Sequence, residues 1–317
     1  MIDFEPKDLA VKDVHAYLLG GVAPRPIALV STMSAEGNVN LSPFSFFNAF
    51  GANPPIVVFS PSRRGHDGSL KDTYNNIVTN KECVIQAVTY EMVQQVSLAS
   101  TEYDTGVDEF VKAGLTPVAS DLVKPPRVKE SPFQMECRLL QMIPLGEGGA
   151  AGNLAVCEVV KFHIWEDVIV DGVIQPDRID LVGRMGASFY TRAVGDSIFK
   201  VAKPIGKRGI GYDQLPEFVR TSDLLTANHL AQLANVEVIP SDDEVTTFVF
   251  NLKKQTDSGA GKPGYYREVF LSALEDLDSD RNVAVRQMFA AAIRALEADD
   301  VAFAWRALLY ARTVETV

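Results

Sequence analysis

Closely spaced apolar runs in the first half of the chain limit the possible fold more than any other feature of the sequence. Five of them read as β-strands: IALVSTM (27–33), PPIVVFSP (54–61), ECVIQAVTY (82–90), MECRLLQMIPL (135–145) and LAVCEVVKFHIWE (154–166). Helical patterns lie between these runs only at about 70–79 and 91–99, and a short opening helix is expected at 7–19. Many strands with few intervening helices predict a β-barrel or sandwich rather than a doubly wound sheet.

The pattern changes after about residue 195. A segment rich in glycine, proline and charge comes first, and residues 223–235 then predict a helix capped by Ser222 or Asp223. Farther along, one apolar stripe recurs at helical spacing: Val285, Met288, Phe289, Ala292, Ile293 and Leu296. We therefore expect a β-rich domain at 1–200 and a mainly helical C-terminal extension at 201–317.

The charge of the chain bears on its partners. Its 317 residues include 30 lysines and arginines against 41 aspartates and glutamates, so the formal net charge is −11 at pH 7. An acidic chain repels phosphate backbones and anionic lipids, so neither nucleic acid nor membrane is an expected partner. The acidic N-terminus lacks a signal-peptide pattern and no apolar run could span a bilayer, which together predict a cytoplasmic protein.

The usual catalytic and metal-binding motifs do not occur in the sequence. Cys83, Cys137 and Cys157 form no C-x-x-C pair, and buried free thiols are expected for Cys83 and Cys157, which lie in strand-like runs. The four histidines have no metal-ligand spacing, so no metal site is predicted. Of the two glycine-rich segments, 146–153 precedes a strand and 206–211 lacks a Gly-Lys-Ser/Thr ending, so neither is a nucleotide-binding loop.

The segment NLSPFSFFNAF (40–50) mixes hydroxyls and amides with four phenylalanines. A strand that leaves its ladder here would expose unpaired backbone groups, which must find partners. A planar heteroaromatic ligand could use those groups along its polar edge while its faces rest on the aromatic side chains. A buried strand with an irregular end would explain the same residues.

Two neighbouring segments add cationic and hydroxyl groups. SPSRRG (60–65) follows a strand, and GSLKDTYNNI (68–77) predicts a helix with Ser69 as its cap and with Lys71 and Thr73 in its first turn. A helix N-terminus with a lysine and nearby arginines is a phosphate site, although solvated surface charges would explain each residue singly. Taken with the aromatic segment, these residues indicate a flat ring with a phosphate arm, as in flavin mononucleotide (FMN).

The sequence RPIALVSTMSAEGNVNLSPFSFFNAFGANPPIVVFSPS, followed by KDTYNNI, resembles the flavin reductase-like FMN-binding split-barrel family. A later run, EVVKFHIWEDVIVDGVIQPDRIDLVGRMGASFYTRA (158–193), is similar to the closing strands of that family. The resemblance implies a mainly β (α+β) fold: a six-stranded antiparallel Greek-key split barrel with flanking helices. It further implies a homodimer with FMN bound at the interface.

The resemblance also implies roles for individual residues. Beside the flavin ring it places Ser31 and Thr32, and along the ring Pro43, Phe44, Ser45 and Phe46. At the ribityl and phosphate groups it places Ser60, Arg63, Lys71, Asp72 and Thr73, although spacing does not decide between Arg63 and Arg64. Arg184 and His163 would lie near the ring or the incoming reductant, with His163 the candidate catalytic residue; His163 could equally be a core or surface histidine.

Three functions fit these observations. The first is an FMN-dependent oxidoreductase, most simply a flavin reductase that uses NADH or NADPH. The second is a flavin-binding electron carrier or a module that serves a partner oxygenase. The third has no flavin: the barrel would carry a helical interaction domain, and Arg63 and Lys71 would be replaceable.

Overall fold

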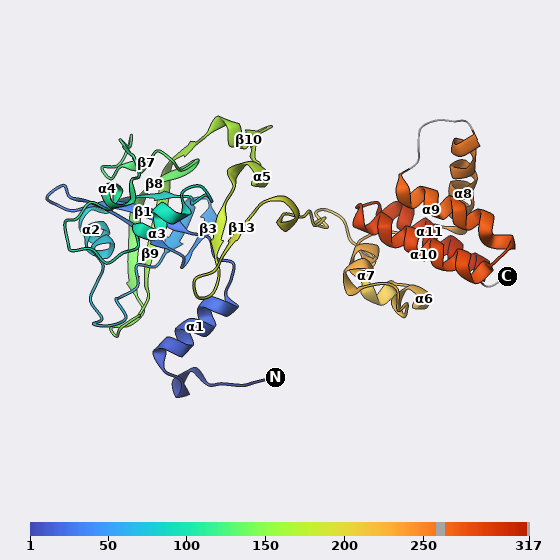
Figure 1. The fold of residues 1–317 in the computed structure, drawn as a ribbon, viewed down its shortest axis with the longest axis horizontal. Coiled ribbons are helices and arrows are strands. Elements are labelled where there is room, and N and C mark those ends of the chain that lie inside the picture. Colours follow the sequence, from blue (N-terminus) through green and yellow to red (C-terminus); the bar gives the residue numbers. More distant parts are fainter. Residues whose placement is uncertain (258–263, 316–317) are drawn as a thin grey trace. The chain divides into compact units, whose positions relative to one another are not determined.

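The structure is a computed structural model that describes residues 1–257 and 264–315 (Figure 1). The chain forms two compact units, Met1–Lys200 and Val201–Val317. Each unit has its own buried hydrophobic residues, with Phe59 and Leu29 among those of the first and Trp305 among those of the second.

Antiparallel strands dominate the first unit. Seven of them form one sheet in the order β2-β1-β5-β8-β9-β4-β3. Their bounds are β1 Ala28–Met33, β2 Val39–Phe44, β3 Phe47–Ala52, β4 Pro55–Phe59, β5 Glu82–Gln86, β8 Phe133–Pro144 and β9 Asn153–Ile164. Short pairs outside this sheet are β6 Pro117–Val118 with β7 Arg127–Val128, β10 Ile169–Val170 with β11 Val173–Ile174, and β12 Val182–Arg184 with β13 Tyr190–Arg192.

The helices of this unit are short. They are α1 Val11–Gly21, α2 Asp72–Asn80, α3 Val93–Leu98, α4 Glu109–Ala113 and α5 Pro176–Ile179, with 3-10 turns η1 Pro6–Asp8, η2 Glu166–Val168 and η3 Gly195–Ser197. All the strand pairings within the described residues are antiparallel. These helices are therefore not crossovers of a parallel sheet, and the expected mixed α+β fold with an antiparallel sheet is confirmed.

The two edge strands of the sheet, β2 and β3, are consecutive in the chain. Only Ser45 and Phe46 separate them, yet β2 pairs with β1 while β3 pairs with β4 at the opposite end of the strand order. The sheet must therefore curl until a two-residue connection can join its edges. The six strands implied by the resemblance differ from the seven observed in this sheet, in which residues 39–52 form two strands separated by Ser45 and Phe46.

Strand β1 is buried on both of its faces. Ala28 and Val30 belong to one core cluster and Leu29 to another, as the two-residue period of a strand requires. The first cluster also contains the three cysteines, all buried and free, which confirms the expectation for Cys83 and Cys157.

The second unit is helical in its described residues. Its helices are α6 Glu217–Arg220, α7 Ala227–Ala234, α8 Asp242–Asp257, α9 Tyr265–Glu275, α10 Arg281–Glu297 and α11 Val301–Glu315, with 3-10 turns η4 Tyr212–Gln214 and η5 Asp276–Asp278. Trp305 is fully buried, and its indole N–H donates to the Leu233 carbonyl at 3.0 Å. Within the described ranges, every helix is too short or too polar to cross a lipid bilayer.

Two sequence predictions for this unit have different outcomes. The apolar stripe forms the inner face of α10, where Met288, Phe289 and Leu296 are buried. The predicted cap of the helix expected at 223–235 is wrong. This helix, α7, begins at Ala227, and Thr226 Oγ1 accepts a hydrogen bond from the His229 backbone N–H at 3.3 Å. Ser222 instead stabilises a turn by accepting from the Leu224 N–H at 3.3 Å, before the helix starts.

Because each unit has its own core, we predict that residues 1–200 fold without the extension. A chain truncated after Lys200 should keep a cooperative urea unfolding transition and dispersed amide signals in an NMR spectrum. A truncated chain that is insoluble, or that unfolds without a cooperative transition, would show that the first unit depends on residues 201–317.

Candidate functional site

The bend between β2 and β3 is held by hydrogen bonds from distant residues. Neither Ser45 nor Phe46 pairs in the ladder. The Phe46 carbonyl accepts from the Ser60 backbone N–H at 2.9 Å, and Ser45 Oγ accepts from Arg25 Nε at 3.3 Å. Phe44 is buried against Phe59, with ring centroids 5.3 Å apart, whereas the Phe46 side chain is 38% exposed. The mixed composition of this segment thus belongs to a bent connection, with Pro43 still paired opposite Leu29.

A polar cavity, here the Lys71 cavity, lies beside this bent segment at the start of α2. Its lining includes Asn40, Ser42, Arg64, Lys71, Asp72, Thr73 and Glu109. Lys71 precedes the first helical residue, and no side chain caps this helix end. Its first backbone N–H groups therefore remain available as donors, beside two cationic side chains.

Lys71 has an unusual environment for a lysine. Its Nζ lies 5.4 Å from the centroid of the Phe44 ring, and no ion pair or hydrogen bond to Nζ occurs within residues 1–257 and 264–315. Burial, and then the charge of Arg64, lower the pKa of the Lys71 ammonium, while Glu102 acts in the opposite direction. A desolvated cation without a partner lowers the stability of the fold, so this position suits an incoming anion.

Arg64, rather than Arg63, lines the Lys71 cavity. Arg64 Nη1 donates to the Leu70 carbonyl at 2.7 Å, and Arg64 Nε lies 3.8 Å from a Glu102 carboxylate oxygen. Arg63 Nη1 instead donates to the Gly68 carbonyl at 2.9 Å.

The predicted cap of α2 is also wrong. Ser69 Oγ donates to Asp67 Oδ1 at 2.7 Å and so stabilises the preceding loop, while Lys71 occupies the cap position. The helix begins two residues later than a Ser69 cap would require.

A hydrogen-bond network joins several residues that line the Lys71 cavity. The Glu109 carboxylate accepts from the Leu41 backbone N–H and from Asn40 Nδ2, both at 2.9 Å. Asn40 Oδ1 in turn accepts from Thr73 Oγ1 at 2.7 Å and from Thr32 Oγ1 at 3.3 Å. Burial raises the pKa of the Glu109 carboxyl group. Sequence analysis missed both Glu109 and Asn40, because a contact across 68 residues leaves no local pattern.

Two predicted site serines are engaged within the protein. Ser31 is fully buried, and its hydroxyl donates to the Pro126 carbonyl. Ser60 is 6% exposed, and its Oγ accepts from the Asn153 backbone N–H at 3.1 Å. Both hydroxyls therefore have partners within the protein, and neither serine lines the Lys71 cavity.

A second, largely apolar cavity of about 500 Å³ is lined by Phe47 and Ala49 of β3 and Val57 of β4, among others. Arg25 also lines it. Within the described residues, the Arg25 guanidinium is bonded only to neutral groups, including the Leu19 carbonyl at 2.6 Å and the Met185 carbonyl at 3.1 Å. Burial, and then the charge of Arg184, lower the pKa of Arg25.

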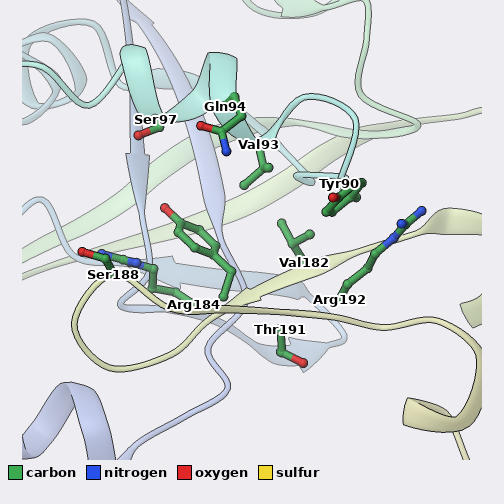
Figure 2. Close-up of a pocket in the computed structure, with 10 residues that line it drawn as sticks. Tyr90, Val93, Gln94, Ser97, Val182, Arg184, Ser188, Thr191 and Arg192 are labelled. Atoms are coloured by element: carbon green, nitrogen blue, oxygen red, sulfur yellow. The ribbon is translucent and has the colours of Figure 1, made fainter.

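Arg184 lines a third cavity, here the Arg184 cavity, of about 370 Å³ (Figure 2). Its guanidinium lies 4.5 Å from the centroid of the Tyr190 ring, and its Nη1 donates to the Phe189 carbonyl at 3.3 Å. The structure thus does not bring Arg184 into the lining of the Lys71 cavity.

His163 also lies outside the Lys71 cavity. Its Nε2 is 2.7 Å from Glu136 Oε1, and its ring lines a cavity with Arg127, Lys129 and Gln134. Glu136 additionally accepts from the backbone N–H groups of residues 121–123. His163 therefore stabilises a loop in this structure, and its role toward a flavin stays a prediction.

The histidine belongs to a cluster with metal-ligand chemistry. Ligand-type atoms of Asp121, Glu136 and His163 lie within 4.8 Å of one another. The Lys161 ammonium already pairs with Asp121, and Glu136 is hydrogen-bonded as described. The carboxylates of this cluster therefore already have charged or hydrogen-bonding partners within the protein.

We predict that Lys71→Met raises the free energy of unfolding of the ligand-free protein, by about 1 kcal/mol, because it removes a partnerless cation while keeping the packing against Phe44. The lowered pKa of Lys71 gives the sign of the pH dependence: the cost of the charge is present at neutral pH and is relieved as the pH rises toward 10.5. The difference between Lys71→Met and wild type in urea unfolding should therefore shrink at high pH. A destabilised variant at neutral pH would contradict this account of Lys71.

Known proteins are similar to this chain in sequence and in fold. Residues 20–173 match the family described as flavin reductase like domain. A protein of Aquifex aeolicus is 36% identical over 202 residues, which are 63% of this chain and 100% of that protein. The nitrilotriacetate monooxygenase component B from Bacillus cereus is 32% identical, with a TM-score of 0.60 over 63% of this chain and 98% of its own. A candidate flavin reductase with split barrel domain from Shewanella frigidimarina is 25% identical, with a TM-score of 0.55 over 64% of this chain and 100% of its own. This chain belongs to the flavin reductase-like family.

Proposed function

We propose that this protein binds FMN and acts as an NAD(P)H-dependent flavin reductase. The observation that carries the proposal is the Lys71 ammonium, which has no hydrogen-bond or ion-pair partner in the part of the chain that the structure describes and lies beside Arg64 at an uncapped helix N-terminus. In a chain with a net charge of −11, such a cluster of donors suits a phosphate.

The residues of the Lys71 cavity fit the phosphate arm of FMN. Lys71 and Arg64 would supply cationic donors, and the free backbone N–H groups at the start of α2 would supply neutral ones. The network from Glu109 through Asn40 to Thr73 would keep the first turn of this helix in place.

The bend supports a ring site next to that phosphate site. Phe44 contacts Lys71 on one side of the bend, and Phe47 lines the apolar cavity on the other. Three residues span at most roughly 10 Å of extended chain. One ligand with an anionic arm and a flat ring could therefore extend from the Lys71 cavity to the apolar cavity.

The protein's own groups would control the chemistry at that ring. Bound FMN would supply a two-electron hydride acceptor. Apolar lining residues such as Phe47 and Val57 would exclude water, and the Arg25 guanidinium would stabilise negative charge that develops nearby. Hydride transfer itself needs no catalytic acid.

The homodimer and the cytoplasmic location expected from the sequence stay predictions.

A second candidate function is a flavin-binding module that serves a partner oxygenase or carries electrons. The observation that favours it is the 32% identity to a monooxygenase component B. Such a module would keep the FMN site and lack direct reduction by a nicotinamide nucleotide.

We predict that the double variant Arg64→Ala with Lys71→Ala weakens FMN binding at least about tenfold, because each charge-assisted phosphate hydrogen bond contributes roughly 1.5–3 kcal/mol. Fluorescence quenching of FMN during titration with the protein measures the dissociation constant. Arg63→Ala, paired with the same lysine substitution, is the matched control, since it removes an equal charge from the adjacent position outside the cavity lining.

The control variant should retain tighter FMN binding than the Arg64 variant. Equal loss in both pairs would trace the loss to the shared Lys71 substitution and would contradict a specific contact between Arg64 and the phosphate. Unchanged binding in both would place the phosphate elsewhere and remove the basis of the proposal.

We further predict that the FMN-loaded protein is reduced by NADH or NADPH within seconds under anaerobic conditions. Loss of flavin absorbance near 450 nm in a stopped-flow instrument measures this step, and dithionite serves as the control for complete reduction. Reduction by dithionite but by neither nucleotide would favour the second candidate function.

A further inference from the structure

Three carboxylates of the described residues line the Lys71 cavity, and they differ in what they contact. The Asp72 carboxylate accepts a hydrogen bond from a threonine hydroxyl at 3.2 Å. Glu109 accepts two hydrogen bonds in the network described above. Glu102 differs from both, because its one ion pair or hydrogen bond within the described ranges is with Arg64, whose Nε lies 3.8 Å from the carboxylate oxygen. Two carboxylates therefore stabilise the walls of the cavity, and the third faces one of its cations.

Glu102 lies on the loop between α3 and α4, of which residues 99–103 line the cavity. Thr105 Oγ1 donates to Asp72 at 3.2 Å and so attaches this loop to the first residue of α2. The Glu102 side chain itself is 63% exposed. Exposed side chains change rotamer rapidly, so this carboxylate can turn from Arg64 to solvent while the loop backbone stays in place.

The charge of Glu102 acts on both cations of the cavity. Its partner Arg64 is the less exposed of the two side chains in the pair, at 22%. Burial, and then the charge of Arg64, lower the pKa of the Lys71 ammonium, and the charge of Glu102 opposes them. In the ligand-free protein Glu102 therefore supplies part of the negative charge that a bound phosphate would supply. The pair is longer than a charge-assisted hydrogen bond, and exposed pairs contribute little to stability, so a phosphate can displace it.

We infer that Glu102 competes with the phosphate of the ligand for Arg64 and thereby sets the affinity of the Lys71 cavity. While Glu102 faces Arg64, the arginine is not available to the ligand, and the apparent affinity falls by the fraction of molecules in which it is engaged. When the phosphate enters, the Glu102 side chain turns to solvent, because its charge would otherwise repel the anion. That the anion is the phosphate of a flavin rests on the proposed function.

The test compares FMN with riboflavin, which lacks the phosphate, on the full chain. Fluorescence quenching of each flavin measures its dissociation constant for wild type, Glu102→Gln and Glu297→Gln. Glu297 is the matched control: it forms an exposed pair with Arg294 at 3.4 Å on α10, so its substitution makes the same change in net charge outside the lining of the cavity. Urea unfolding checks that each variant is folded.

We expect Glu102→Gln to bind FMN at least about threefold more tightly than wild type, and riboflavin within about twofold of wild type, because only the phosphate competes with Glu102. Glu297→Gln should match wild type for both flavins. In an Arg64→Ala background, Glu102→Gln should change FMN affinity by less than about twofold, since the arginine for which the two anions compete is gone.

FMN binding that is absent, unchanged or weaker in Glu102→Gln would overturn the inference, and so would an equal gain for riboflavin. A gain of the same size in the Arg64→Ala background would also overturn it, because the carboxylate would then act by general repulsion. Failure of the proposed function has a separate signature: FMN binding would then be insensitive to the combined Arg64 and Lys71 substitutions, whatever Glu102→Gln does.

Discussion

The two-residue connection between β2 and β3 is the constraint on which the site depends. Ser45 and Phe46 join strands from opposite edges of a seven-stranded sheet, so they must lie where the curled sheet meets itself. Backbone groups there do not pair in the ladder: the Phe46 carbonyl accepts from the Ser60 backbone N–H instead, and Arg25 donates to the Ser45 hydroxyl. The strands that it joins line two of the cavities: Asn40 and Ser42 on β2 line the Lys71 cavity, and Phe47 on β3 lines the apolar cavity.

Positive charge is concentrated around that connection although the chain as a whole is acidic. Lys71 lacks a polar partner within the described residues, and Arg25 and Arg184 have only neutral ones. By contrast, Arg192 has a close bidentate carboxylate partner. Arg25 nevertheless stabilises the fold, because its guanidinium joins Ser45 to the Leu19 and Met185 carbonyls. The charge of Lys71 has no such structural use within the described residues, which is the basis for proposing that it meets a ligand.

The sequence predicted β1, β4, β5, β8 and β9, because a strand buried in a sheet appears in the sequence as a run of apolar residues. It identified residues 40–50 as anomalous but missed β3, whose residues are largely exposed and therefore lack an alternating pattern. It located a cationic helix start at Lys71 but could not choose between Arg63 and Arg64. Adjacent residues point to different sides of an extended loop, and which side faces the cavity depends on contacts with distant segments.

The remaining site features depend on tertiary contacts. Glu109 accepts a hydrogen bond from Leu41 on β2, which is far away in the sequence. The pairing of β8 with β9 brings His163 within hydrogen-bond distance of Glu136. A sequence pattern records local periodicity, so it can suggest that a histidine or glutamate is present on an element but not which neighbour it meets.

The desolvated ammonium of Lys71 has a consequence for the lifetime of the protein in a cell. A ligand that binds only the folded state shifts the folding equilibrium by mass action. If phosphate from a flavin relieves this charge, chains without the ligand would unfold more often and be degraded sooner than loaded ones. Protein abundance would then follow the supply of that ligand.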